Sequence, residues 1–327
     1  MVRARGLLRR AARRFPAPLR VAWNLLPASV QRRLAPLVYP IALGSRQTPI
    51  PYDMTPPPGA ARAVWRDDGS GRVVPRASIV LVTYDNRELT RLCLDSLDRA
   101  TAYPDYEVIV VDNGSTDGTV TLLRDFAARD GRLRLILNPH NAGFAAATNQ
   151  GIRAATGEYV VMLNDDTVVS THWLARLLAP LAAAGSDVGL VCPSTNRIGN
   201  DAQIVTNYRD LAGMERLAWQ RNQEFGAAVR DLPMVALFCA AARRQVLLDV
   251  GLLDERFAIG MFEDDDLSRR MQARGLRTVC ADGGFVHHFG QASFGKLDED
   301  EYQRIWEANR RRFEEKWGAW TPPRSWP

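Results

Sequence analysis

Residues 107–112 read EVIVVD and pass directly into NGSTDGT, so an apolar run of strand length ends in polar turn-forming side chains. The same pattern recurs where SIVLVT (78–83) is followed by YDN, and where EYVVMLN (158–164) is followed by DDT. Short apolar runs bounded by such residues are typical of buried strands. Helical periodicity fills the intervals, at 88–100, 117–130 and 142–156. This alternation predicts an α/β protein with a doubly wound, mostly parallel sheet.

The polar residues that end these strands predict where a ligand binds, because the crevice of such a sheet lies beyond the carboxyl ends of its strands. Asn164, Asp165 and Asp166 follow one strand directly. Adjacent carboxylates repel each other unless a cation lies between them, and carboxylates with substrate phosphates are the usual ligands of Mg²⁺. The alternative is an acidic turn that caps the next helix through Thr167 or Thr171.

Two later segments also carry candidate chemistry. Four acids, Glu263 to Asp266, precede a helical pattern at 267–275, and their crowding favours one carboxyl with the raised pKa of a general base. A helix N-terminus and an Asp266–Arg270 pair are the structural alternative for the last two acids. His287 and His288 are two of the four histidines in the chain, and imidazoles are suited to a metal or a phosphate.

Several function classes lose their main support. The first strand is not followed by GxGxxG, and the chain has no GxxxxGK[ST], GxSxG or HExxH motif. With 46% hydrophobic and 24% charged residues, the chain has ordinary globular composition. The chain contains no run of 18 apolar residues, so no transmembrane helix is predicted. The four cysteines lie far apart, which favours reduced thiols in a core over a disulfide framework.

The N-terminal region has a separate character. Residues 1–46 contain ten arginines and no acid, although the whole chain has a net charge of only +5. Their helical periodicity predicts a basic amphipathic arm that contacts an anionic membrane surface. Packing on the protein's own acidic body is the second interpretation, and a nucleic-acid arm is the least favoured. The proline-rich residues 47–76 are predicted to be a linker.

Taken in order, seven segments resemble inverting family 2 glycosyltransferases with the GT-A fold, most closely the rhamnosyltransferase-like enzymes of bacterial surface polysaccharides. They are SIVLVTYDN (78–86), EVIVVDNGSTDGT (107–119), NPHNAGFAAATNQGI (138–152), GEYVVMLNDDT (157–167), VGLLDERF (250–257), FEDDDLSRRM (262–271) and HHFGQASF (287–294). The resemblance implies a GT-A domain over 77–320. It comprises a Rossmann-like nucleotide-sugar half (77–170), an acceptor and catalytic-base half (171–296) and a C-terminal helix (297–320).

The resemblance also implies roles for individual residues. The catalytic base is Asp264, with Glu263 beside it. Asn164 stands where the family's DxD motif has its first carboxylate. The resemblance therefore implies that Asp166 is the main ligand of the metal, Mg²⁺ or Mn²⁺, with Asp165 and His288 as further ligands. The residues expected to contact the nucleotide sugar are Thr83, Tyr84, Asp112, Asn113, Asn149, Asn164 and Asp165. Asn113 departs from the aspartate often found there, which leaves the base open.

The expected activity is inverting transfer of a sugar from a nucleotide-diphosphate donor, with dTDP- or UDP-sugars favoured, to a lipid-linked or polysaccharide acceptor. No nucleic-acid partner is expected, and the expected location is cytoplasmic, at the inner face of the membrane. A sugar nucleotidyltransferase is the alternative, but the loop after the first strand, TYDNREL, lacks the glycine-rich basic character of those enzymes. A non-catalytic sugar-nucleotide-binding subunit would have no need of Asp165, Asp166 and Asp264 together.

Overall fold

The computed structural model describes residues 52–56, 74–290 and 298–321 of the chain. The predicted basic arm (1–46) and most of the predicted linker (47–76) lie outside these residues. All the elements below belong to one unit, Asp53–Arg324. Among the described residues, no helix has both the length and the apolar character needed to cross a membrane.

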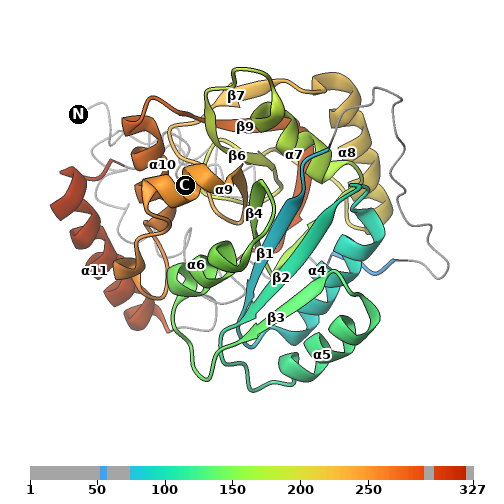
Figure 1. Cartoon of the computed structure of the whole chain (residues 1–327), viewed down its shortest axis with the longest axis horizontal. Helices are drawn as coiled ribbons and strands as arrows, with labels where there is room; N and C mark the ends of the chain where they lie inside the picture. The colour runs from blue at the N-terminus through green and yellow to red at the C-terminus, as the bar shows by residue number, and fades with distance from the viewer. Residues whose placement is uncertain (1–51, 57–73, 291–297, 322–327) are drawn as a thin grey trace, which may run out of the picture. The chain divides into compact units, whose positions relative to one another are not determined.

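Four parallel strands form one half of the sheet. They are β1 (Ala77–Thr83), β2 (Tyr106–Asp112), β3 (Leu133–Leu137) and β4 (Tyr159–Asn164). They lie in the order β3–β2–β1–β4, with each neighbouring pair parallel (Figure 1). The three central strands, β1, β2 and β4, are almost wholly buried, which explains why they are continuous apolar runs and do not alternate.

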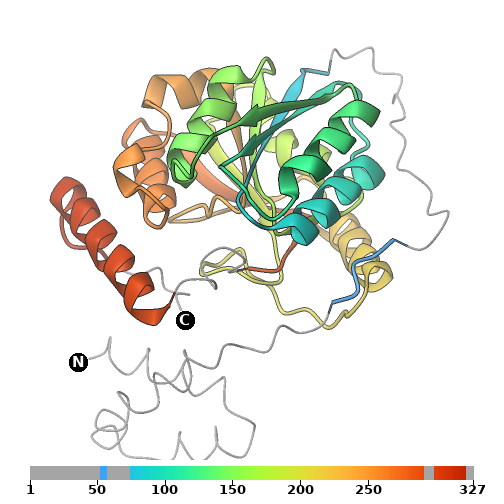
Figure 2. The same cartoon turned by 90° about the horizontal axis from the view of Figure 1, so that it is seen from below.

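Three crossover helices connect these strands. They are α4 (Arg87–Ala100), α5 (Thr119–Arg129) and α6 (Phe144–Ala154). Helices α4 and α5 cover one face of the sheet, and α6 covers the other (Figures 1 and 2). Helix α6 packs so closely that a Cβ at Gly151 would lie 2.2 Å from Cγ1 of Val80. The predicted doubly wound arrangement is therefore confirmed in this half.

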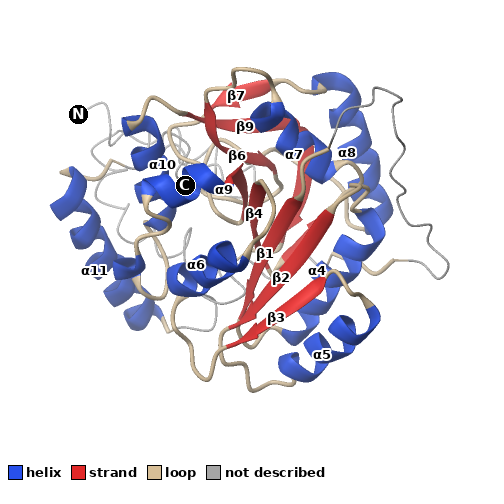
Figure 3. Ribbon diagram, in the orientation of Figure 1, coloured by secondary structure: helices blue, strands red, loops and turns tan. Residues whose placement is uncertain are grey.

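The second half of the sheet mixes strand directions. Its strands are β5 (Thr167–Val169), β6 (Val188–Ser194), β7 (Val229–Asp231), β8 (Cys239–Arg243) and β9 (Arg277–His288). Strand β8 is antiparallel to β4 and to β6, and β9 is antiparallel to β5. Figure 3 shows β9 between β6, to which it is parallel, and β7, to which it is antiparallel. The helices of this half are α7 (Trp173–Ala182), α8 (Leu211–Phe225), α9 (Arg244–Val250), the 3₁₀ helix η2 (Glu255–Phe257), α10 (Glu263–Ala273) and α11 (Glu299–Trp317).

This topology gathers the polar strand ends at one edge of the sheet, the carboxyl edge. The first four strands end there because they are parallel, and β6 and β9 run the same way because β8 reverses direction between β4 and β6. Helix α10 leads into the amino end of β9, so its first residue, Glu263, lies toward the carboxyl edge. There Gly143, before α6, comes so near Ala258 that a Cβ would lie 2.2 Å from the Ala258 carbonyl oxygen.

A short piece of the predicted linker is part of the folded unit. Asp53 pairs with Asp210 in an isolated bridge, in which Asp53 N donates to Arg209 O and Leu211 N donates to Asp53 O. Met54 beside it is buried. Asp53 therefore lies beside the residues that begin α8.

Candidate active site at the carboxyl edge

The first of the two carboxylates after β4 is held by neutral donors from the neighbouring loop and helix. Asp165 is buried and accepts hydrogen bonds from Asn86 Nδ2 at 3.5 Å and from Thr90 Oγ1 at 3.4 Å. Thr90 is in turn 2.7 Å from the hydroxyl of Thr83, the last residue of β1. Burial, followed by the negative charge of Asp166, raises the pKa of Asp165 to about 7.

The second carboxylate meets a histidine across the sheet. Asp166 Oδ1 lies 3.2 Å from His288 Nε2, because Thr167 of β5 is in register with His288 of β9. The other ring nitrogen of His288 is 2.8 Å from the Arg197 carbonyl oxygen, and the ring of Phe238 stacks on the imidazole at 5.0 Å. Burial opposes the charged imidazole, but the charge of Asp166 and the hydrogen bonds to Asp166 and to the Arg197 carbonyl together outweigh it and raise the pKa of His288.

The structural alternative for the β4 carboxylates is not observed. Thr167 is part of β5, and α7 begins after His172 without a side-chain cap. The strand that leads to the histidines is longer than expected, since β9 extends through His288 and is not a short strand at 278–282. His287 beside it is buried with Nδ1 2.7 Å from the Tyr208 hydroxyl, and burial lowers its pKa to about 3.

At the end of β2 the two predicted base-binding residues have different surroundings. Asp112 Oδ2 accepts from the amides of Gly114 and Ser115, whereas Oδ1 is buried and accepts no hydrogen bond from the described residues. The side-chain amide of Asn113 is hydrogen-bonded to the loop before α6. Its Nδ2 donates to Asn141 Oδ1, and its Oδ1 accepts from Ala142 N. The geometry therefore leaves Asp112, more than Asn113, with an oxygen for a ligand.

Two other predicted nucleotide contacts also differ in their surroundings. Tyr84 directly follows β1 at the carboxyl edge and is 36% exposed, and its contact with the nucleotide stays a prediction. Asn149 is buried in α6, where its amide bonds both main-chain groups of Leu253 and also donates to Glu255 Oε1 at 2.9 Å. Those contacts connect the nucleotide half to the segment before α10, and the binding role assigned to Asn149 stays a prediction.

The four acids at the start of α10 are unequally partnered. Asp266 is fully buried and bound by Arg270, Lys316 and the indole of Trp317. Asp265 accepts from Trp320 Nε1 at 3.3 Å. The structural interpretation of the sequence thus describes Asp266 correctly, but its partners include residues from α11 about 50 positions away.

The two remaining acids are the predicted catalytic pair. Asp264 is half-buried and accepts from the amide of Asp265 at 2.9 Å, while Oε2 of Glu263 is buried and accepts no hydrogen bond from the described part of the chain. Burial raises the pKa of Glu263, and burial with the nearby charge of Glu263 raises that of Asp264; both reach about 7. A carboxyl with that pKa is suited to exchange a proton near neutral pH.

The carboxyl edge also suits a divalent cation. Asp166 and His288 offer an oxygen and a nitrogen 3.2 Å apart, both on buried side chains. Among the described residues, no three His, Cys, Asp or Glu side chains form a cluster that holds a metal by itself. These donors therefore fit a cation that takes the rest of its ligands from phosphate oxygens and water.

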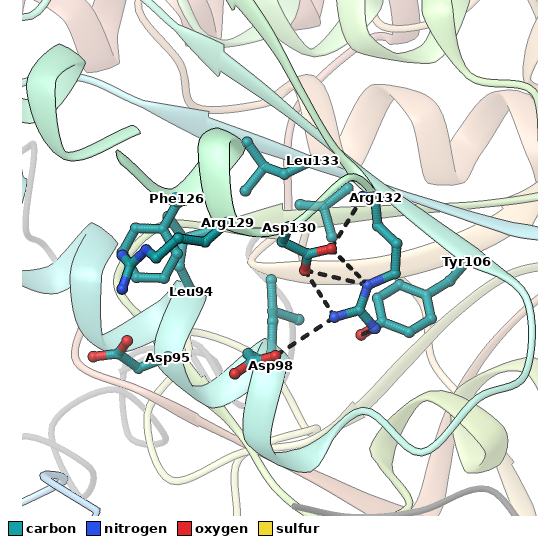
Figure 4. A pocket seen from close by; sticks show the side chains of 11 residues that line it. Leu94, Asp95, Asp98, Tyr106, Phe126, Arg129, Asp130, Arg132 and Leu133 are labelled. Carbon is teal, nitrogen blue, oxygen red and sulfur yellow. Dashed lines mark hydrogen bonds and ion pairs between the residues drawn. The ribbon is translucent and has the colours of Figure 1, made fainter. Parts of the chain in front are cut away.

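A pocket of about 200 Å³ lies at the opposite end of the strands, between α4, α5 and the amino ends of β2 and β3 (Figure 4). It contains none of the predicted site residues. Three of its charged groups bond one another, since Arg132 pairs with Asp130 at 2.7 Å and with Asp98 at 3.5 Å. This pocket is therefore not part of the candidate site.

Sequence reasoning missed the residues that support the site. Asn86 and Thr90 orient Asp165, Arg197 bonds His288, and Lys316 and Trp317 bind Asp266. Asn86 carried a weak signal, because it lies in the quoted segment TYDN. The other supporting residues lie in stretches where periodicity predicts only a helix face or a loop.

Comparison with known proteins identifies the family. Residues 78–251, more than half of the chain, match the family model described as glycosyl transferase family 2. An O-antigen biosynthesis protein of Myxococcus xanthus, RfbC, is 33% identical over 230 residues, which are 66% of this chain and 18% of that protein. The uncharacterized protein y4gI of Sinorhizobium fredii is 28% identical over 263 residues, which are 77% of this chain and 28% of that protein. The chain thus spans less than a third of the length of these two relatives.

A solved structure with the same fold is that of a mannosyltransferase from Pyrobaculum calidifontis, PcManGT, in complex with GDP-Man and Mn²⁺. The TM-score is 0.54 at 22% identity, over 97% of this chain and 77% of that one. This likeness confirms the predicted GT-A fold. With the match over residues 78–251, it leads to one assignment: the chain belongs to glycosyl transferase family 2.

Proposed function

We propose that this chain transfers a sugar from a nucleotide-diphosphate donor to a lipid-linked or polysaccharide acceptor in surface-glycan synthesis, with inversion at the anomeric carbon. The observation that carries the proposal is the topology: Asp112, Asp165–Asp166 and His288 lie at the carboxyl ends of strands that run the same way, and Asp166 contacts His288. Glu263–Asp264 begin the helix that leads back to the amino end of β9. Family membership and the O-antigen biosynthesis name of RfbC support the proposal. A rhamnosyltransferase-like specificity is the narrower form of the same proposal.

The donor's nucleoside would lie over the ends of β1 and β2. There the unbonded oxygen of Asp112 offers an acceptor to the base or ribose, and Tyr84 offers an exposed ring. Asp166 and His288 would hold Mg²⁺ or Mn²⁺, and the carboxylate of Asp165, bonded by Asn86 and Thr90, would lie next to Asp166. When bound, that cation supplies positive charge to the departing diphosphate. The Mn²⁺ in the PcManGT complex supports the choice of metal.

Asp264 would act as the base. It accepts the proton of the acceptor hydroxyl as that oxygen bonds to the anomeric carbon and the bond to the diphosphate breaks. Attack from the face opposite the leaving group in one displacement inverts the anomeric centre. The pKa of about 7 leaves a usable fraction of Asp264 ionised at neutral pH.

The donor is identified by thermal unfolding with dTDP-, UDP- and GDP-sugars, each with and without Mn²⁺ or Mg²⁺. We expect one sugar nucleotide to raise the midpoint strongly, and only with metal, because binding to the native state alone is stabilising. NMR of the product would then report the anomeric configuration. Failure of all donors to stabilise the protein, or a retained configuration, would contradict the proposal.

The basic arm, residues 1–46, is proposed to bring the enzyme to anionic lipid at the cytoplasmic face of the membrane, where lipid-linked acceptors lie. Its ten arginines without an acid support this, since each basic residue near an anionic surface contributes about 1 kcal/mol. Replacing Arg9, Arg10, Arg13 and Arg14 by Gln in the full chain should weaken flotation with anionic vesicles. Unchanged flotation would remove the membrane role.

A further inference from the structure

The loop that leads to the proposed base is strained. Three of its residues are not glycine and yet have left-handed backbone angles: Ala258 with φ +50°, Met261 with φ +78° and Phe262 with φ +73°. A bulky side chain rarely adopts this conformation, and it persists only where surrounding contacts enforce it. Phe262 is also the residue directly before α10, which starts without a side-chain cap. The position of Glu263 and Asp264 therefore depends on what holds this loop.

One buried side chain from α11 bonds the main chain of the loop. Asn309 is 1% exposed, and its Nδ2 donates to Phe257 O and to Gly260 O, both at 2.7 Å. Its Oδ1 accepts from Arg312 Nη1 at 2.6 Å, which fixes the amide orientation. A single amide thus bridges two carbonyl groups on either side of the first left-handed residue, Ala258.

Other residues of α11 also contact the loop and its two ends. Phe262 packs against Trp306 and Phe313 of α11, and against Trp320 after the helix, with ring centroids 5.3 to 5.9 Å apart. Lys316 Nζ lies 3.0 Å from Asp254 before the loop and 2.6 Å from Asp266 after it. Both ends of the loop are therefore tied to one helix that itself contributes no proposed catalytic group.

We propose that Asn309 is a positioning residue, whose amide holds the left-handed turn that sets where Asp264 meets the acceptor hydroxyl. This inference rests on the proposed function, because it takes Asp264 as the base. An apolar side chain of similar size could fill the same space, but it would remove the Asn309 donor from both carbonyls and leave that of Phe257 with only the amide of Gly260, at 3.1 Å. The specific requirement is therefore for the N–H groups and not for bulk.

Asn309→Asp tests this requirement, because the change keeps the shape and replaces the donor by an acceptor facing two carbonyl oxygens. Asn309→Ala is the second variant, and Gln303→Glu, an exposed amide-to-acid change on the same helix, is the matched control. Hydrogen exchange measured by mass spectrometry on the full-length protein should show the segment 256–262 exchanging about tenfold faster in both Asn309 variants. The control and the strands β1 to β4 should exchange as in the wild type.

Turnover is then measured with the donor found by thermal unfolding and with Mn²⁺. The Asn309 variants should lose about tenfold to a hundredfold in kcat, because a small misplacement of the reacting groups is costly. The KM for the donor, and stabilisation by the corresponding nucleoside diphosphate with Mn²⁺, should stay within about twofold, since the nucleotide lies over other strands.

The outcomes separate the two proposals. Wild-type exchange of 256–262 in both variants would overturn the positioning role, and so would faster exchange with unchanged kcat. A rise in the donor KM together with weaker nucleotide binding would indicate general damage to the protein and would also overturn the positioning role. If no donor supports turnover by the wild type, the proposed function fails, while the exchange result alone still decides whether Asn309 holds the loop.

Discussion

Two groups of carboxylates lie at the carboxyl edge, and their partners differ in kind. After β4, Asp165 receives hydrogen bonds from the neutral Asn86 and Thr90, and Asp166 faces His288. At the start of α10, by contrast, Asp266 is bound by the cations Arg270 and Lys316. The first group has neutral donors and the His288 imidazole as its partners. The second is partly neutralised by permanent cations.

This difference suggests a division of labour. The pair after β4 consists of adjacent carboxylates, whose mutual repulsion a divalent cation would relieve. At α10 the cations Arg270 and Lys316 bind Asp266, whereas burial raises the pKa values of Glu263 and Asp264 to about 7, which suits them to exchange a proton near neutral pH. Two clusters of the same residue types are therefore suited to a metal and to a base respectively, because their neighbours differ.

The largest effect should come from removing the base. Asp264→Asn keeps the side-chain shape but cannot accept a proton, so turnover should fall by about 10² to 10⁴-fold. Metal-dependent stabilisation by the donor should be unchanged, because that binding belongs to the β4 group. The matched control is Asp125→Asn on the exposed surface of α5. Normal turnover by Asp264→Asn would assign the proton to another group, with Glu263 next in line.

The reciprocal change tests the metal. Asp166→Asn removes a charged ligand, so the apparent Mn²⁺ affinity in the donor-binding assay should fall at least about tenfold. A titration of Mn²⁺ at fixed donor, followed by thermal unfolding, measures it. Asp187→Asn, at a carboxylate that is 59% exposed, serves as the control. An unchanged Mn²⁺ titration would show that the two acid groups do not divide the roles as proposed.

A third carboxylate provides the contrast of a purely structural acid. Glu107 is buried at the amino end of β2, where burial opposes its charge but bonds from Thr156, Ser78 and Arg134 outweigh this and lower the pKa to about 2. Its stabilising effect is present above its ordinary pKa of 4.5 and is lost as pH falls toward 2.

Glu107→Gln should therefore cost about 2 kcal/mol in the free energy of unfolding at pH 7, and much less near pH 2. Denaturant unfolding at both pH values measures the difference. Glu88→Gln, at a residue that is 63% exposed, should change stability by less than about 1 kcal/mol. An equal cost at both pH values would mean that the lost ionised form is not the cause.

The last expected effect is a change in stability of the opposite sign. Asp264 has a raised pKa, so the stability that its protonated form provides is present below 3.8 and is lost as pH rises through about 7. Asparagine does not ionise, so Asp264→Asn should gain stability relative to the wild type as pH rises from 4, where the two are nearly equal, to 8, where the full shift corresponds to about 4 kcal/mol at most. Thermal unfolding without ligand measures this. A difference independent of pH would contradict the raised pKa.

Much of this protein follows from local sequence. The apolar runs before Thr83, Asp112 and Asn164 have to be buried, and parallel strands bring their polar ends to one edge, so the fold and the acids of the site follow from pattern alone. The four cysteines expected in a core are all buried as free thiols.

Only the tertiary structure decided which of those acids are already satisfied. Asp266 meets Lys316 and Trp317, Asn113 gives its amide to a loop, and Asn309 holds the turn before Asp264. These partners lie between 28 and 52 residues apart in the sequence, on elements that touch only in the folded chain. Burial and pairing set a carboxyl's proton affinity, and neither is a property of the sequence segment that carries it.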